Sequence, residues 1–88
     1  MNFEVEFSDK AKEDIQKHKK FGNIKNWNKI KELIEDICSS PFEGKGKPEP
    51  LKYKFSGKWS RRIDKEHRLI YEIKEDIILI YSAFGHYK

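Results

Sequence analysis

The stretch WSRRIDKEHRLIYEIKEDIILIYSAF, residues 59–84, decides the fold. It contains three runs rich in branched and aromatic residues, at 59–63, 68–74 and 77–84, and this composition is typical of β-strands. Polar residues separate the runs at 64–67 and 75–76, and gaps this short are typical of hairpin turns. The stretch therefore predicts three consecutive antiparallel strands.

Two further strands are expected outside this stretch. Phe3, Val5 and Phe7 alternate with two glutamates, which is the period-2 pattern of a half-buried strand. Residues 52–55 also have a strand-like composition. Between the helical region and that run, residues 42–51 contain two glycines and two prolines, so we expect no regular structure there.

Two helices are predicted between the first strand and residue 41. Ser8 provides an N-cap for a helix that ends near Lys20, with Ala11, Ile15 and His18 on its inner face. A second helix follows Gly22 and Asn23, because apolar residues recur there every three or four positions. These residues are Ile24, Trp27, Ile30, Leu33, Ile34, Ile37 and Cys38.

The element order is thus βααββββ. It predicts an α+β fold in which two helices of the N-terminal half pack on one face of a mainly antiparallel sheet. With 88 residues, the chain has room for one domain, residues 1–88, and for a modest core. We therefore expect a dimer or a tight protein partner to add stability.

Positive charge is concentrated in the second half of the chain. Residues 1–43 hold 8 Lys and Arg against 9 Asp and Glu, whereas residues 44–88 hold 11 against 6. Basic clusters of this kind favour nucleic acid or another polyanion as the partner. No signal peptide or membrane span is predicted, and the single cysteine, Cys38, excludes an internal disulfide. The simplest interpretation is a cytoplasmic protein that contacts RNA and no membrane.

The three arginines of the chain are not equivalent. Side chains alternate along a strand, so Trp59, Arg61 and Ile63 share one face and Arg62 lies on the other. If the apolar pair faces the core, Arg62 is the arginine on the open face, and Arg68 lies on the open face of the next strand. Arginine suits phosphate oxygens because its planar fork is always charged. The alternative is a solvated, charged sheet face without a ligand.

Three other side chains are candidates for catalysis or binding. Glu49 lies between two prolines that restrict its backbone, which suits a general base, but it could equally be a loop glutamate that offsets lysines. His86 could donate a proton to a leaving oxygen, although a histidine so near a terminus is often inert. Tyr87 could stack on a base or cover apolar surface. His67, in a predicted turn, is expected to be structural or solvated.

Other chemistries are poorly supported. Three scattered histidines and one cysteine do not have the spacing of metal ligands, so no metal or cofactor is expected. The run Gly44-Lys45-Gly46-Lys47 is too short for a Walker A loop and lacks its strand-to-helix context. Cys38 belongs to the apolar helix face and is expected to be a small core residue.

The run PFEGKGKPEPLKYKFSGKWSRRIDKEHRLIY, residues 41–71, resembles the signature of YoeB-type toxins in the RelE superfamily of bacterial toxin–antitoxin systems, and the closing His86-Tyr87 agrees with it. The resemblance implies a microbial-ribonuclease-like fold and an endoribonuclease that cuts mRNA in the ribosomal A site. It also implies a homodimer and a YefM-type antitoxin.

The same resemblance implies roles for individual residues. Glu49 matches the general base of the family, His86 the general acid and Arg68 the arginine that stabilises the transition state. The substrate-binding positions are matched by Lys52, Arg62 and Tyr87.

Two positions depart from the family pattern, since Phe84 replaces a basic residue and Lys88 follows the tyrosine. Two other functions stay open at this point: a non-catalytic, ParE-like topoisomerase inhibitor, and a module that binds RNA and blocks the ribosome without cutting. A fold of this type does not by itself decide among the three.

Overall fold

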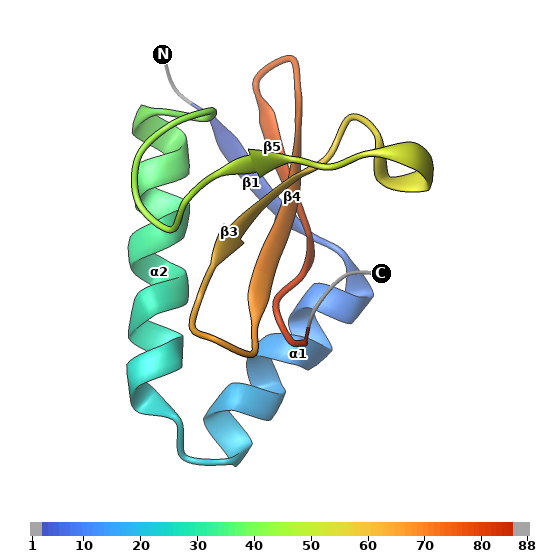
Figure 1. The fold of residues 1–88 in the computed structure, drawn as a ribbon. Coiled ribbons are helices and arrows are strands. Elements are labelled where there is room, and N and C mark those ends of the chain that lie inside the picture. Colours follow the sequence, from blue (N-terminus) through green and yellow to red (C-terminus); the bar gives the residue numbers. More distant parts are fainter. Residues whose placement is uncertain (1–2, 86–88) are drawn as a thin grey trace.

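The computed structural model describes residues 3–85, within which the strands form one five-stranded sheet (Figure 1). Their order across the sheet is β1-β5-β4-β3-β2. The strands are β1 (Glu4–Phe7), β2 (Glu49–Pro50), β3 (Trp59–Arg62), β4 (Arg68–Lys74) and β5 (Ile77–Ser82). Strand β1 pairs in parallel with β5, and the other three pairings are antiparallel. The sheet is therefore mixed but mainly antiparallel, as predicted.

The two helices are α1 (Asp9–Lys20) and α2 (Ile24–Ser39). The Ser8 hydroxyl accepts the Ala11 N–H at 3.0 Å, and the Asn23 side chain caps α2 in the same way. Both caps satisfy backbone donors that the first helical turn leaves free. The sequence-based bounds of both helices are confirmed.

One core joins both helices to one face of the sheet. It contains Ala11 and Ile15 of α1, Ile30, Leu33 and Ile37 of α2, Leu69 and Tyr71 of β4, and Ile78 and Ile80 of β5. Cys38 is partly buried against this core, as expected of a small apolar residue. We call the opposite side of the sheet the helix-free face.

The predicted strand at residues 52–55 is wrong. Residues Tyr53–Phe55 form a single 3₁₀ turn, and the edge strand lies earlier, at Glu49–Pro50, where no regular structure was expected. Tyr53 has a φ of +59°, which is incompatible with an extended chain. A proline is tolerated in β2 because that strand forms the edge of the sheet.

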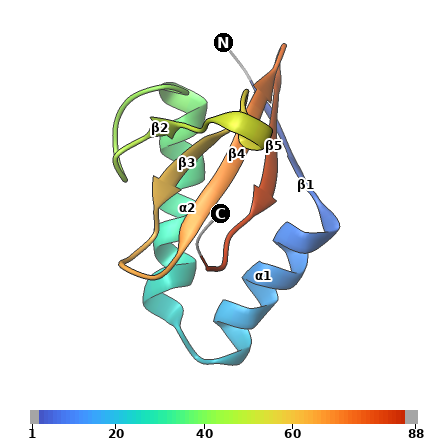
Figure 2. The ribbon, with the colours of Figure 1, turned by 45° about the vertical axis from the view of Figure 1, so that its right-hand side comes forward.

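After β5 the chain passes α1, which brings its last described residues close to the first helix (Figure 2). The predicted strand 77–84 is correspondingly shorter and ends at Ser82. Within residues 3–85, no helix is long and apolar enough to cross a membrane.

Candidate active site

The pairing register places three of the predicted site residues on the helix-free face. Arg62 of β3 lies opposite Arg68 of β4, and Glu49 of β2 lies opposite Ser60. Directly opposed residues in antiparallel strands project to the same side, and Ser60 and Arg62 are two residues apart. One carboxylate and two guanidinium groups therefore come from three neighbouring strands on one side of the sheet.

Arg61 projects to the other side and is fully buried, whereas Arg62 is exposed. The alternation predicted from the sequence is thus confirmed. The Arg61 guanidinium donates five hydrogen bonds, to the Tyr71 hydroxyl, the Asp36 carboxylate and the backbone carbonyls of Ser40, Glu43 and Lys45. Its contact with Asp36 is an ion pair of 2.6 Å. Every N–H of this buried cation has an acceptor, which is the condition under which burial of a charge is tolerated.

These bonds hold residues 40–46, which lead toward Glu49. The Tyr71 hydroxyl donates to the Pro41 carbonyl at 2.8 Å, and the Arg62 N–H donates to the Gly46 carbonyl at 2.6 Å. Gly44 has a φ of +114°, and a Cβ there would lie 2.2 Å from the Asp36 carboxylate. The glycine-rich run is therefore needed for close packing against α2.

Hydrogen bonding and burial fix the ionisation of two groups that hold residues 40–46. The Lys45 N–H and the Arg61 guanidinium both donate to Asp36 and lower the pKa of that carboxyl. Burial raises the pKa of Tyr71, so its hydroxyl stays protonated and keeps its hydrogen to donate. Asp36 is consequently ionised, and Tyr71 uncharged, throughout the neutral pH range.

Glu49, in the edge strand β2, and Lys52, two residues after that strand, are both exposed. They belong to residues 49–55, which line a surface groove of about 640 Å³. Tyr53 lies in the same groove with 92% of its surface exposed. A bulky residue with positive φ and almost no burial is uncommon, and no local sequence pattern predicts it here.

Arg68 is partly buried, and its guanidinium turns back toward the β3–β4 turn. Its Nη1 donates to the carbonyls of Asp64 at 2.8 Å and His67 at 3.1 Å. These bonds come from Nη1, one of the three nitrogens of the guanidinium, and they orient the group. The turn thus controls the direction of the arginine.

Residues 83–85, which follow β5, are held by side chains from α1 and the β3–β4 turn. The Ala83 N–H donates to Asp14 at 2.9 Å, and the Ala83 carbonyl lies 2.7 Å from Nε2 of His18. The Gly85 N–H donates to Nδ1 of His67 at 2.8 Å, and its carbonyl accepts the Arg68 N–H at 3.0 Å. The predicted site residues His86 and Tyr87 lie outside the described residues.

Phe84 packs against two histidines, which also contact each other. Its ring centroid lies 4.3 Å from that of His67 and 5.1 Å from that of His18. The Lys17 ammonium lies 5.1 Å from the same ring, within cation–π distance. The expected structural role of His67 is confirmed, but its partners come from distant segments and could not be read from the sequence.

Among residues 3–85, no group of three or more His, Cys, Asp or Glu side chains could hold a metal ion. The helix-free face carries the exposed Glu49 carboxylate, the exposed Arg62 guanidinium and the Arg68 guanidinium, which is bound by turn carbonyls. Such an arrangement suits binding of a phosphodiester and proton transfer near it.

Comparisons with known proteins show which family this chain resembles. The model of a family described as "YoeB-like toxin of bacterial type II toxin-antitoxin system" matches residues 7–87. The toxin YoeB of Escherichia coli is 59% identical over 59 residues, which cover 67% of this chain and 70% of that protein.

Two solved structures from Staphylococcus aureus are similar over nearly the whole chain. A YoeB dimer superposes with a TM-score of 0.89 at 39% identity and covers 99% of this chain and 100% of its own. A YoeB–YefM complex superposes with a TM-score of 0.86 at 40% identity, with the same coverage.

Fold and sequence together define a small toxin of a bacterial type II toxin–antitoxin system. More particularly, the chain belongs to the YoeB-like toxin family.

Proposed function

We propose that this toxin is an endoribonuclease that cuts mRNA in the ribosomal A site and so inhibits translation. The observation that carries the proposal is the shared orientation of Glu49, Arg62 and Arg68 on the helix-free face. These side chains are the ones that phosphodiester cleavage needs: a base on a restrained backbone and two cations that bind phosphate. Membership of a toxin family supports the choice of a cellular target.

In the proposed mechanism Glu49 takes the proton of an RNA 2′-hydroxyl, and the 2′-oxygen attacks the adjacent phosphorus. The bond to the 5′-oxygen then breaks, and His86 gives that oxygen a proton. The products are a 2′,3′-cyclic phosphate and a 5′-hydroxyl, so atoms and protons balance without a further reactant. Glu49 and His86 end with exchanged protonation states and must be reset before the next cycle.

The negative charge that develops at phosphorus is stabilised by Arg68, with Arg62 and Lys52 alongside. Preorganised cations are effective because they need no reorganisation during the reaction, and loss of one typically costs about 10²–10³ in rate. Because side chains supply this stabilisation, the proposed mechanism requires no metal ion. Tyr87 is assigned to the base next to the cleaved bond, where an aromatic ring can stack.

The same proposal specifies protein partners. The solved relatives include a YoeB dimer and a YoeB–YefM complex, so we infer a homodimer and a neutralising antitoxin of the YefM type for this chain. The third partner is the ribosome with its bound mRNA, which places the toxin in the cytoplasm. The surplus of positive charge in residues 44–88 supports association with RNA.

Primer extension on mRNA from a cell-free translation reaction tests the proposal. We expect the wild type to produce breaks at A-site codons, and Glu49→Gln and His86→Ala to reduce them by about 10²–10⁴. Glu43→Gln is the matched control, since Glu43 is an exposed glutamate of the same segment whose backbone carbonyl, not its side chain, binds Arg61.

Three results would contradict the proposal. Full cleavage by both variants would show that Glu49 and His86 are not the base and the acid. Stalled ribosomes carrying intact mRNA would indicate a binding module that blocks translation. Intact mRNA together with an inhibited topoisomerase would indicate a ParE-like inhibitor.

A further inference from the structure

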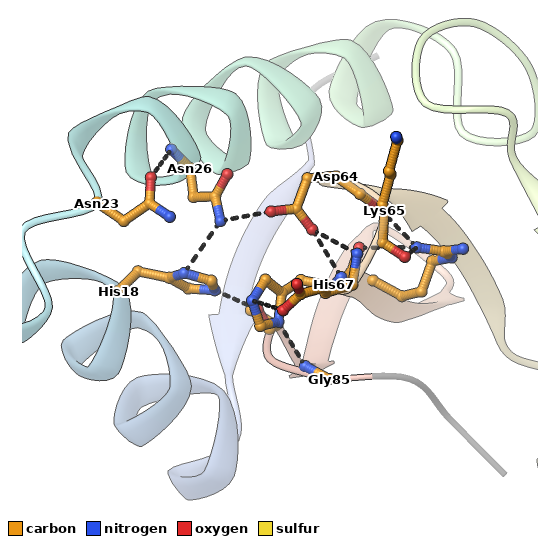
Figure 3. A network of polar contacts seen from close by, with 10 residues as sticks. His18, Asn23, Asn26, Asp64, Lys65, His67 and Gly85 are labelled. Carbon is orange, nitrogen blue, oxygen red and sulfur yellow. Dashed lines mark hydrogen bonds and ion pairs between the residues drawn. The ribbon is translucent and has the colours of Figure 1, made fainter.

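The chain leaves β5 through a segment, residues 83–85, whose backbone groups are bound by two histidines (Figure 3). His18 binds the carbonyl of Ala83 and His67 binds the N–H of Gly85. Gly85 immediately precedes His86 in the sequence. The direction of the chain at Gly85 therefore governs where the next residue can go.

The hydrogen bond to Gly85 requires one form of the His67 side chain. A backbone N–H can only donate, so Nδ1 of His67 must carry a lone pair and its proton must lie on Nε2. The ring is consequently neutral whenever this bond exists. Protonation of Nδ1 would place two donors opposite each other and break the bond.

A second set of bonds fixes the backbone of His67. The Asp64 carboxylate accepts the N–H groups of Glu66 and His67, both at 2.8 Å, and the Asn26 amide at 2.9 Å. Partial burial works against ionisation of Asp64, but these three hydrogen bonds outweigh it and lower the pKa of the carboxyl. Figure 3 shows the resulting chain of contacts from Asn26 of α2 through Asp64 to His67 and Gly85.

The ring of His67 is also restrained by packing. It lies against Phe84 and edge-on to His18, with a centroid distance of 4.8 Å to the latter. The His18 Nε2 donates to the Ala83 carbonyl, so its Nδ1 is left to face the Asn26 amide at 3.5 Å. Both imidazoles therefore present a defined ring nitrogen to the backbone of residues 83–85, at the same end of β5.

We propose that His67 is a positioning residue, whose neutral Nδ1 fixes Gly85 and so orients the segment that carries the catalytic acid His86. This inference rests on the proposed function for the role of His86, but the bond from Gly85 to His67 stands on geometry alone. His67 touches neither substrate nor reacting atoms in this scheme and acts only through the backbone.

Because Nδ1 of His67 accepts from Gly85 only when it carries no proton, catalysis should depend on the charge of His67. The titratable and charged groups that contact His67 are His18 of α1, Asp64 and Glu66 of the turn, and Arg68 of β4. Lys17 and Asp14 of α1 contact Phe84 and Ala83, in the segment that His67 holds. Glu66 lies nearest the outer nitrogen, with Oε2 4.0 Å from Nε2. Loss of a proton acceptor at Nδ1 should release Gly85 and lower the rate, while substrate binding elsewhere on the helix-free face is preserved.

Two substitutions of His67 separate the hydrogen bond from the packing. His67→Leu keeps an apolar side chain against Phe84 but cannot accept a hydrogen bond. His67→Asn carries its amide oxygen on Cγ, where Nδ1 is attached in histidine, and can accept from Gly85. Glu75→Gln is the control, because this exposed glutamate lies in the turn between β4 and β5, at the opposite end of β4 from His67.

Two readouts are compared: the hydrogen-exchange protection of the Gly85 amide by NMR, and single-turnover cleavage on programmed ribosomes. We expect His67→Leu to lose protection at Gly85 and to lower the cleavage rate at saturation roughly 10- to 100-fold, as for misplacement of a catalytic group. The half-saturating toxin concentration should stay unchanged. His67→Asn should restore both quantities in large part, and Glu75→Gln should match the wild type.

The wild type provides a test that needs no substitution. The pH is lowered stepwise, and protonation of the His67 ring is followed by ¹⁵N NMR. The chemical shift of the Gly85 amide should change with the same midpoint. Unchanged Gly85 protection in His67→Leu, or a Gly85 shift independent of His67, would overturn the inference. Loss of Gly85 protection with unchanged cleavage would also overturn it, since the bond would then position nothing.

Failure of the proposed function gives a different pattern. If His86→Ala cleaves as fast as the wild type, the assignment of the acid is wrong, whatever Gly85 does. If His86→Ala is inactive and His67→Leu is fully active, only the positioning role is wrong.

Discussion

Residues 40–46, which lead toward Glu49, and residues 83–85, which lead into His86, are held in place by different chemistry. The first segment is bound by the guanidinium of Arg61, which stays charged at any pH that a protein tolerates. The second is bound by the imidazoles of His18 and His67, the Asp14 carboxylate and the Arg68 N–H, and its bond from Gly85 requires a lone pair on Nδ1 of His67. The comparison indicates that the approach to the proposed base is fixed, whereas the approach to the proposed acid can respond to pH.

The two segments also differ in how closely they are packed. Gly44 and Gly46 lie against Asp36 and Leu33 of α2, with no room for a side chain. No described residue lies within 4 Å of a Cβ built on Gly85. Substitutions should therefore damage the first segment through folding and the second through function.

The largest expected effect comes from replacing each of the two adjacent arginines by methionine, one at a time. Arg61→Met leaves the Asp36 carboxylate without its buried partner and should cost about 3–5 kcal/mol of unfolding free energy, as for other broken buried pairs. Arg62→Met removes an exposed side chain and should change stability by less than about 0.5 kcal/mol. Urea unfolding followed by circular dichroism measures both.

Cleavage assays on the same two variants test the functional role of Arg62. Arg62→Met should stay folded and lose about 10²–10³ in rate if its guanidinium binds phosphate. Equal stability of the two variants would contradict the assignment of Arg61 to the core and Arg62 to the site.

A second pair compares glycines of the two segments. Gly44→Ala combines backbone strain of roughly 1–3 kcal/mol with a clash against Asp36, so we expect a loss of about 3 kcal/mol. Gly85→Ala carries only the cost of a positive φ, here +80°, or about 1–2 kcal/mol. Thermal unfolding should rank the variants in this order, and the reverse order would show that the second segment is the more closely packed one.

The smallest effect is a difference in pH response between two backbone amides. The Lys45 N–H donates to Asp36, whose pKa lies below the ordinary value of 3.8. A lowered pKa means that the ionised form contributes stability above pH 3.8 and that this contribution is lost as pH falls through the lower, folded-state value. Protection of the Lys45 amide should therefore be constant from pH 8 to 5.

The Gly85 amide donates instead to Nδ1 of His67, which accepts only while it carries no proton. Protection of this amide, corrected for the intrinsic exchange rate, should fall by roughly 2- to 12-fold when that nitrogen is protonated, the value of one hydrogen bond. Hydrogen exchange by NMR at several pH values resolves the two amides in one sample. Parallel behaviour of both would show that the two segments do not differ in the proposed way.

Much of this architecture could be predicted from local sequence patterns. Ser8 marks the start of α1, three-to-four residue spacing defines α2, and alternation along residues 59–63 separates Arg61 from Arg62. These features depend on neighbours within one element, so a single sequence contains the information. The fold class follows from their order.

The remaining features depend on contacts between distant segments. The edge strand β2 has two residues, one of them proline, and gives no periodic signal. Nothing in the residues of β1 specifies parallel pairing with β5. His18 and His67 are 49 positions apart and meet only because α1 packs beside the end of β5, so the positioning network could not be predicted from either residue alone.

The central claim is that Glu49 and His86, at the ends of these two segments, act on one phosphodiester. A double-mutant cycle of single-turnover cleavage on ribosomes, with Glu49→Gln, His86→Ala and both together, tests it most directly. Residues that act as one catalytic unit are strongly non-additive, so we predict that the double variant is no slower than the slower single variant, within a few-fold. Losses that multiply, or single variants that cleave at the wild-type rate, would contradict the account.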